Sequence, residues 1–178
     1  MSIRNILIAA LFVVSFVLAV MVGNSTYMAY RQFQNSDRVE MLARYDKALF
    51  TALLNFRSER GDSATALTLA PEKSAASIAS FKGMRAKVQA AMADAATLAA
   101  SFDDAGLTKA VSDLNAVYGG FDALRRKVDA NVDLPLDKRE AGLDKTVLSQ
   151  GNDLITSLEK TSTVVEGVSV QVARKQPG

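Results

Sequence analysis

The segment RSERGD, residues 57–62, concentrates the side chains of this chain that could bind a charged ligand. Arg57 and Arg60 are three positions apart, so in a helix they lie on the same side. Two guanidinium groups placed in this way could hold a carboxylate or another small anion, because arginine offers planar bidentate donors. Glu59 and Asp62 could instead neutralise both arginines through local salt bridges. The segment is therefore either a ligand-binding site, with Arg57 and Arg60 as the candidate residues, or a charged helix end.

No other part of the sequence carries a recognisable catalytic or metal-binding motif. The chain has 178 residues without Cys or His, which excludes thiol nucleophiles, histidine bases, disulfides and Cys/His metal sites. Asp103 and Asp104 are adjacent carboxylates, but they precede Gly106 in a polar stretch that is typical of a turn and helix cap. The basic run Arg125–Lys127 is expected on a solvent-exposed helix face. We therefore expect no enzyme activity, no cofactor and no metal.

The net charge of +2 provides no strong basic field, so a nucleic-acid partner is not expected. Sparse Gly and Pro, with abundant Ala, Leu and Val, favour long helices over sheet.

The most apolar segment is Ile6–Gly23, which contains no charge and a single hydroxyl, Ser15. Eighteen helical residues at about 1.5 Å each span roughly 27 Å, close to the hydrocarbon thickness of a bilayer. Arg4 precedes the segment, which by the positive-inside rule places residues 1–5 in the cytoplasm and everything after Gly23 outside. A cleaved signal peptide is the alternative, although its apolar region is usually about 7–15 residues long. The sequence predicts a transmembrane helix over residues 6–23 and an extracytoplasmic domain over residues 24–178.

Heptad-like apolar spacing predicts four long helices after this segment. The first is expected to continue the membrane helix from residue 4 or 5 to about 60, where Gly61 could end or kink it. The second begins near Pro71, the third spans 107–128 with Gly119-Gly120 allowing close packing or a bend, and the fourth starts at 136–138. The clearest seams are Leu42, Tyr45, Leu49, Ala52 and Phe56 in the first helix and Val147, Gly151, Leu154, Leu158, Thr161, Val165, Val168 and Val172 in the fourth. The predicted fold class is all-α, an N-terminal transmembrane helix that continues into an up-down-up-down four-helix bundle.

The fourth helix points back toward the predicted membrane, and no second apolar span follows it. This suggests a truncated chain, with a true C-terminus at Gly178 as the alternative.

In architecture the whole chain resembles the N-terminal sensor region of a bacterial methyl-accepting chemotaxis protein. The resemblance rests on four features: Arg4, the span Ile6–Gly23, its helical continuation to Phe56, and the seam Val147–Val172. The stretch RSERGDSA, residues 57–64, is also similar to the arginine-rich helix ends of nitrate- and nitrite-sensing helical domains. The resemblance implies a homodimeric receptor in the bacterial inner membrane, single-pass in this fragment, with the bulk of the chain periplasmic.

The function expected from this resemblance is that of a transmembrane chemoreceptor fragment. It would sense a small ligand outside the cytoplasm, with an anion as one candidate, and transmit a helix displacement to a chemotaxis output module. A coupling protein and a histidine kinase would be reached only through output parts that this sequence does not contain. The alternatives are the sensor region of a histidine kinase or diguanylate cyclase, a single-anchor structural helical protein, or a secreted helical protein cleaved near Ser25.

Overall fold

The protein is all-α over residues 3–174, the part of the chain that the structure, a computed structural model, describes. Within α1, the side chains at positions 3–14, 16, 17, 19, 29, 31, 32, 34 and 35 lie outside this description. The elements are α1 (Ile3–Thr68), α2 (Pro71–Ala99), α3 (Ala105–Val132), the short 3₁₀ helix η1 (Leu136–Lys138) and α4 (Leu143–Arg174).

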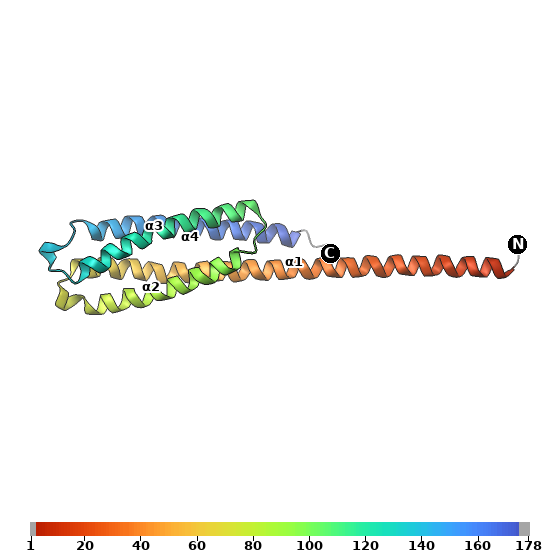
Figure 1. Ribbon diagram of the computed structural model, residues 1–178, viewed down its shortest axis with the longest axis horizontal. Coiled ribbons are helices and arrows are strands. Elements are labelled where there is room, and N and C mark those ends of the chain that lie inside the picture. Colours follow the sequence, from red (N-terminus) through yellow and green to blue (C-terminus); the bar gives the residue numbers. More distant parts are fainter. Residues whose placement is uncertain (1–2, 175–178) are drawn as a thin grey trace.

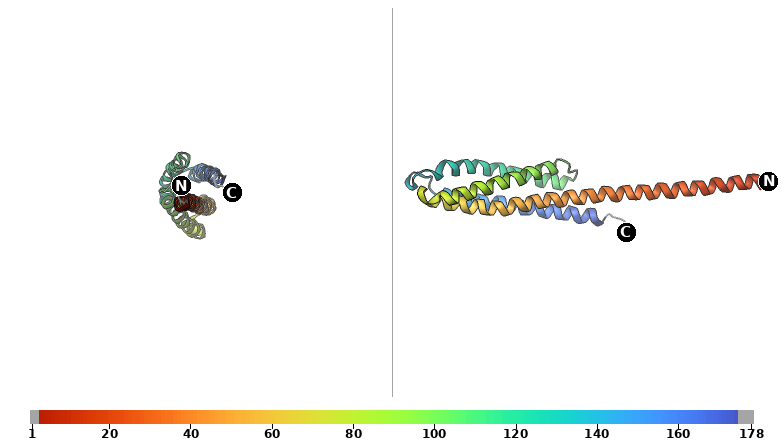
Figure 2. Two further views of the ribbon diagram at one scale, coloured as in Figure 1. Left: turned by 90° about the vertical axis from the view of Figure 1, so that its right-hand side faces the viewer. Right: turned by 90° about the horizontal axis from the view of Figure 1, so that it is seen from below.

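The four long helices lie roughly along one direction in a bundle-like arrangement, and α1 extends far beyond the others (Figure 1). Both α2 and α4 pack along the C-terminal half of α1, and α3 packs mainly on α4, whereas α2 and α3 make few contacts with each other. The end-on view shows the helices in a curved row rather than a closed square (Figure 2). Of the helices that the structure describes, none lies beside the N-terminal half of α1 (Figures 1 and 2).

The core follows the two seams predicted from the sequence. Leu42, Tyr45, Leu49, Ala52 and Phe56 are at most 1% exposed, and all eight predicted α4 positions are buried. The ring of Phe56 meets that of Phe121 edge to face, with centroids 4.8 Å apart, and joins α1 to α3. Removal of apolar surface from water therefore holds the helices together along these seams.

The first helix is longer than predicted, because it continues through Gly61 to Thr68. A glycine within a helix costs about 1 kcal/mol relative to alanine. The burial of Ala64, Ala66 and Leu67 outweighs that cost. Residues 57–62 are consequently helical, and the turn to α2 falls at Leu69-Ala70, before Pro71 at the first helical position, as predicted.

The other predicted boundaries are partly confirmed. Asp104 caps α3 by accepting a hydrogen bond from the Leu107 amide at 2.9 Å. The expectation that Gly119-Gly120 allows close packing is wrong, since a Cβ at either glycine would meet no atom within 4 Å. Only η1 forms at 136–138, and α4 begins later, at Leu143.

One guanidinium group joins two helix ends at the tip of the molecule that lies farthest from the N-terminus. Arg139 donates hydrogen bonds of 2.7–2.9 Å to five backbone carbonyls, at Ala66, Leu67, Leu69, Val132 and Leu134. The last carbonyls of a helix lack intrahelical partners and carry partial negative charge. Arg139 therefore stabilises the C-terminal ends of α1 and α3 together.

The predicted localisation in the inner membrane is contradicted. Among the residues that the structure describes, no helix combines the length and the apolar composition needed to cross a bilayer. Residues 6–23 are helical as part of α1, but the side chains at most of these positions lie outside the description. This finding contradicts the prediction of a single-pass membrane protein with most of its chain in the periplasm. The described part of the chain does not include residues 1–2 of the predicted cytoplasmic segment. The predicted truncation after residue 178 also lies outside it.

Candidate functional site

Arg57 and Arg60 lie on the same side of α1, as predicted, and both contact α4. The Nη2 atom of Arg57 is 2.8 Å from Oε1 of Glu159, and both side chains are about half exposed. Arg60 donates a hydrogen bond to Oδ1 of Asn152 through Nη1, and its buried Nε has no hydrogen-bond partner among the described residues. The aliphatic part of Arg60 covers Gly151, where a Cβ would come within 2.4 Å of its Cδ.

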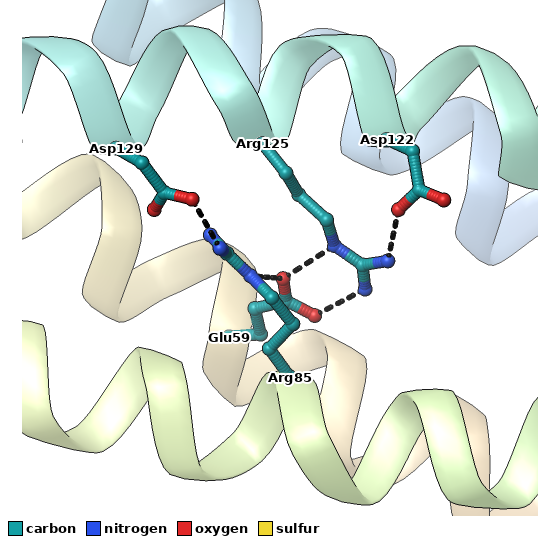
Figure 3. Close-up of polar contacts among 5 residues, drawn as sticks. All are labelled: Glu59, Arg85, Asp122, Arg125 and Asp129. Carbon is teal, nitrogen blue, oxygen red and sulfur yellow. Dashed lines mark hydrogen bonds and ion pairs between the residues drawn. The ribbon is translucent and has the colours of Figure 1, made fainter.

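The two neighbouring carboxylates do not neutralise these arginines. Glu59 instead pairs with Arg85 of α2 and Arg125 of α3, between α1, α2 and α3 (Figure 3). Asp62 accepts a hydrogen bond from the hydroxyl of Ser80 on α2, at 2.5 Å. The alternative interpretation of the segment, a charged helix end with local salt bridges, is therefore wrong in detail. The charged residues of the segment instead contact other helices: the two arginines contact α4, Asp62 contacts α2, and Glu59 contacts both α2 and α3.

Glu59 is the centre of a buried ionic cluster, which we define as Glu59, Arg85, Asp122, Arg125 and Asp129 (Figure 3). Its carboxylate accepts three hydrogen bonds, from Nε and Nη2 of Arg125 at 2.7 and 2.6 Å and from Nε of Arg85 at 3.1 Å. The outer carboxylates complete the cluster, because Asp122 accepts from Arg125 and Asp129 from Arg85, each at 2.7 Å. One carboxylate on α1 thus holds guanidinium groups from α2 and α3.

Burial determines the electrostatics of this cluster. The Glu59 side chain is 1% exposed and that of Arg125 is 4% exposed. Burial alone would lower the pKa of Arg125. The hydrogen bonds that Arg125 donates to Glu59 and the charge of Glu59, with further hydrogen bonds to Asp122 and Tyr118, hold this pKa above its ordinary value. Arg125 also lies over the rings of Tyr118 and Phe121, at 5.1 and 5.5 Å. Arg125 is therefore charged in the folded protein.

The charged groups of the cluster are paired mainly with one another. Its three carboxylates and two guanidinium groups leave one excess negative charge, and every carboxylate is engaged by a guanidinium. Within the part of the chain that the structure describes, the buried Nη2 of Arg85 has no hydrogen-bond partner. In the described part of the chain, no group of acidic residues could hold a metal ion. The arrangement can set the relative positions of three helices, and a buried charge network is suited to that task.

Sequence reasoning missed this cluster, although a signal was present. Arg125 was expected on a solvated face, but it falls on the apolar repeat Phe121-Arg125-Val128 with spacings of four and three. Glu59 continues the first-helix seam three positions after Phe56. Arg85 lies between Phe81 and Val88 in the same register. Three charged residues at core positions on three helices predict mutual pairing, because isolated buried charges are too costly.

Comparisons with protein-family models, with curated proteins and with solved structures found no match for this chain. No family is therefore assigned, and the functional argument rests on the contacts described above.

Proposed function

We propose that this chain is a ligand-responsive sensor module, in which capture of a small anion by Arg57 and Arg60 changes the contact between α1 and α4. The finer architecture that we propose is an up-down-up-down four-helix bundle, with α1 as the element that carries the signal away from it. Homodimerisation and a chemotaxis output through a coupling protein and a histidine kinase stay predictions from the resemblance.

The observation that supports the proposal is that both candidate arginines, one turn apart on α1, bind side chains of α4. Glu159 holds Arg57, and Asn152 holds Arg60. An anionic ligand would compete with Glu159 for Arg57, because both present carboxylate-like oxygens to the same guanidinium. A ligand that occupied both arginines would remove two of the links between these helices. It would shift the arrangement of α1 and α4 only to the extent that it binds one arrangement more tightly.

The length of α1 connects this local change to the rest of the chain. The helix is continuous for 66 residues, about 100 Å at 1.5 Å per residue. Packed helices move in small discrete steps, so a changed contact at residues 57–60 would be carried along the whole rod.

The binding test uses the full chain and small anions of defined chemistry, namely formate, acetate, nitrate and succinate, titrated at constant ionic strength and followed by calorimetry. We expect Arg57→Ala and Arg60→Ala each to weaken binding at least fivefold while helicity stays unchanged. Glu159→Gln should strengthen binding, because it frees Arg57. Glu166→Gln, an exposed α4 carboxylate without an ion pair among the described residues, is the matched control. Unchanged binding in both alanine variants would remove the site assignment.

The displacement test uses the absence of cysteine in the chain. Spin labels at Glu40→Cys on α1 and Gln171→Cys on α4, both exposed positions, report the distance between the two helices. The anion that binds most tightly should shift this distance distribution, and Arg57→Ala should abolish the shift. Binding without any change in the distribution would favour a structural helical protein over a sensor.

A further inference from the structure

A second candidate binding site lies away from the charged segment, in a groove between α1 and α2. The groove has a volume of about 610 Å³, within the range of about 300–1,000 Å³ typical of small-molecule sites. Its lining includes three small apolar side chains, Ala48 of α1 with Ala90 and Ala91 of α2, which we call the alanine floor. Arg44, Lys47 and Lys87 border it, with Asp94 as the acidic residue of the lining. We call this feature the α1–α2 groove.

The basic residues of the α1–α2 groove outnumber its one acidic lining residue three to one. Arg44, Lys47 and Lys87 form no salt bridge with any described residue, whereas Arg38, Arg57, Arg85 and Arg125 all do. All three unpaired residues are exposed. An excess of cations beside an alanine floor is complementary to a ligand with both anionic and apolar parts.

The helix geometry defines the spacing of these charges. α1 and α2 run in opposite directions from the turn at Leu69-Ala70. Counted from that turn, Arg44 and Asp94 lie at nearly the same level, so their charges offset each other. Lys47 and Lys87 then remain, at levels about 7 Å apart along the helix axes at 1.5 Å per residue.

We propose that the α1–α2 groove binds an organic dicarboxylate, with an apolar chain over the alanine floor and one carboxylate at each of Lys47 and Lys87. This site is independent of the proposed function, because Arg57 and Arg60 face α4 and none of the groove residues belongs to that contact.

The test compares adipate with hexanoate, which has the same number of carbons but one carboxylate fewer, at constant ionic strength. Binding to the full chain is followed by the amide resonances of Ala48 and Ala90. We expect adipate to bind at least fivefold more tightly than hexanoate, since only adipate reaches both lysines. Lys47→Gln combined with Lys87→Gln should weaken adipate binding at least tenfold. Lys82→Gln, an exposed lysine of α2 outside the groove lining, is the matched control and should change nothing.

Each outcome decides the proposal. Equal affinities for adipate and hexanoate would refute a two-point electrostatic site, and equal losses in Lys82→Gln and the double variant would reduce the effect to general surface charge. If the amide resonances of Ala48 and Ala90 do not shift at saturating adipate, binding in the groove is refuted. Arg57→Ala with Arg60→Ala should leave these resonance shifts intact. If these resonance shifts are lost in that double variant, adipate binds at the α1–α4 contact and not in the groove.

Discussion

Neutralising the centre of the buried ionic cluster by Glu59→Gln should destabilise the protein strongly. The substitution keeps the size of the side chain but removes its charge. Three hydrogen bonds, at 2.6, 2.7 and 3.1 Å, end on this carboxylate, and the guanidinium groups that donate them are 4% and 13% exposed. Breaking a buried ion pair by removing one partner costs about 3–5 kcal/mol, because the other charge stays buried without compensation. Glutamine retains one carbonyl acceptor, so we expect about 3 kcal/mol.

Glu159→Gln provides a matched control on the neighbouring helix contact. The Glu159–Arg57 pair has a comparable distance of 2.8 Å, but its side chains are 51% and 50% exposed. Exposed pairs contribute only about 0–1 kcal/mol, since water and salt screen them. The two isosteric substitutions should therefore differ by about 2 kcal/mol or more in the free energy of unfolding. Because the two pairs differ mainly in exposure, this control attributes the difference in stability to burial.

Urea denaturation followed by circular dichroism at 222 nm measures both values. The combined variant Glu59→Met with Arg125→Met should be more stable than Glu59→Met alone, because an apolar pair removes the unpaired guanidinium. If Glu59→Gln falls within 1 kcal/mol of Glu159→Gln, the carboxylate is not the electrostatic centre of the cluster. The reasoning from burial would then be refuted.

Three further predictions concern other contacts. Arg139→Lys should cost about 2 kcal/mol in urea denaturation, because an ammonium group cannot reach carbonyls of two helix ends at once; an unchanged midpoint would contradict this. Gly151→Ala should cost about 1–3 kcal/mol by displacing Arg60, whereas the control Gly167→Ala, with nothing near its Cβ, should be neutral or stabilising. Burial raises the pKa of Tyr45 to about 12, so stability should fall between about pH 10 and 12 as the unfolded chain ionises first. Tyr45→Phe should remove that alkaline loss, by up to about 2–3 kcal/mol in pH-dependent denaturation.

The apolar seams were predictable because heptad spacing encodes one buried face directly. Tyr45, Phe56, Val147 and Leu154 all occupy the core positions that their spacing indicated. The end of α1 was not predictable in the same way. Gly61 and the charges around it favour a helix end locally, but contacts with other helices decide the outcome, and a local pattern does not contain them.

The candidate site was predictable only as a list of residue types. The spacing of Arg57 and Arg60 indicated a shared side, and the structure has that side against α4. The partner of Glu59 could not be deduced from its neighbours in the chain, because Arg125 is 66 positions away. A rule based on short-range pairs assigns such residues to solvent. Their register within the apolar repeats was the better guide.

The hydrogen bonds of Arg139 have a mechanical consequence for the long helix. They fasten the C-terminal end of α1 to that of α3, so this tip acts as a pivot. Any tilt of α1 moves residues near the pivot least and its N-terminal end most. Over 66 residues, about 100 Å, a tilt of one degree displaces the far end by about 1.7 Å. A tilt too small to disturb the core near residues 57–60 would therefore become a displacement of atomic size at residue 3.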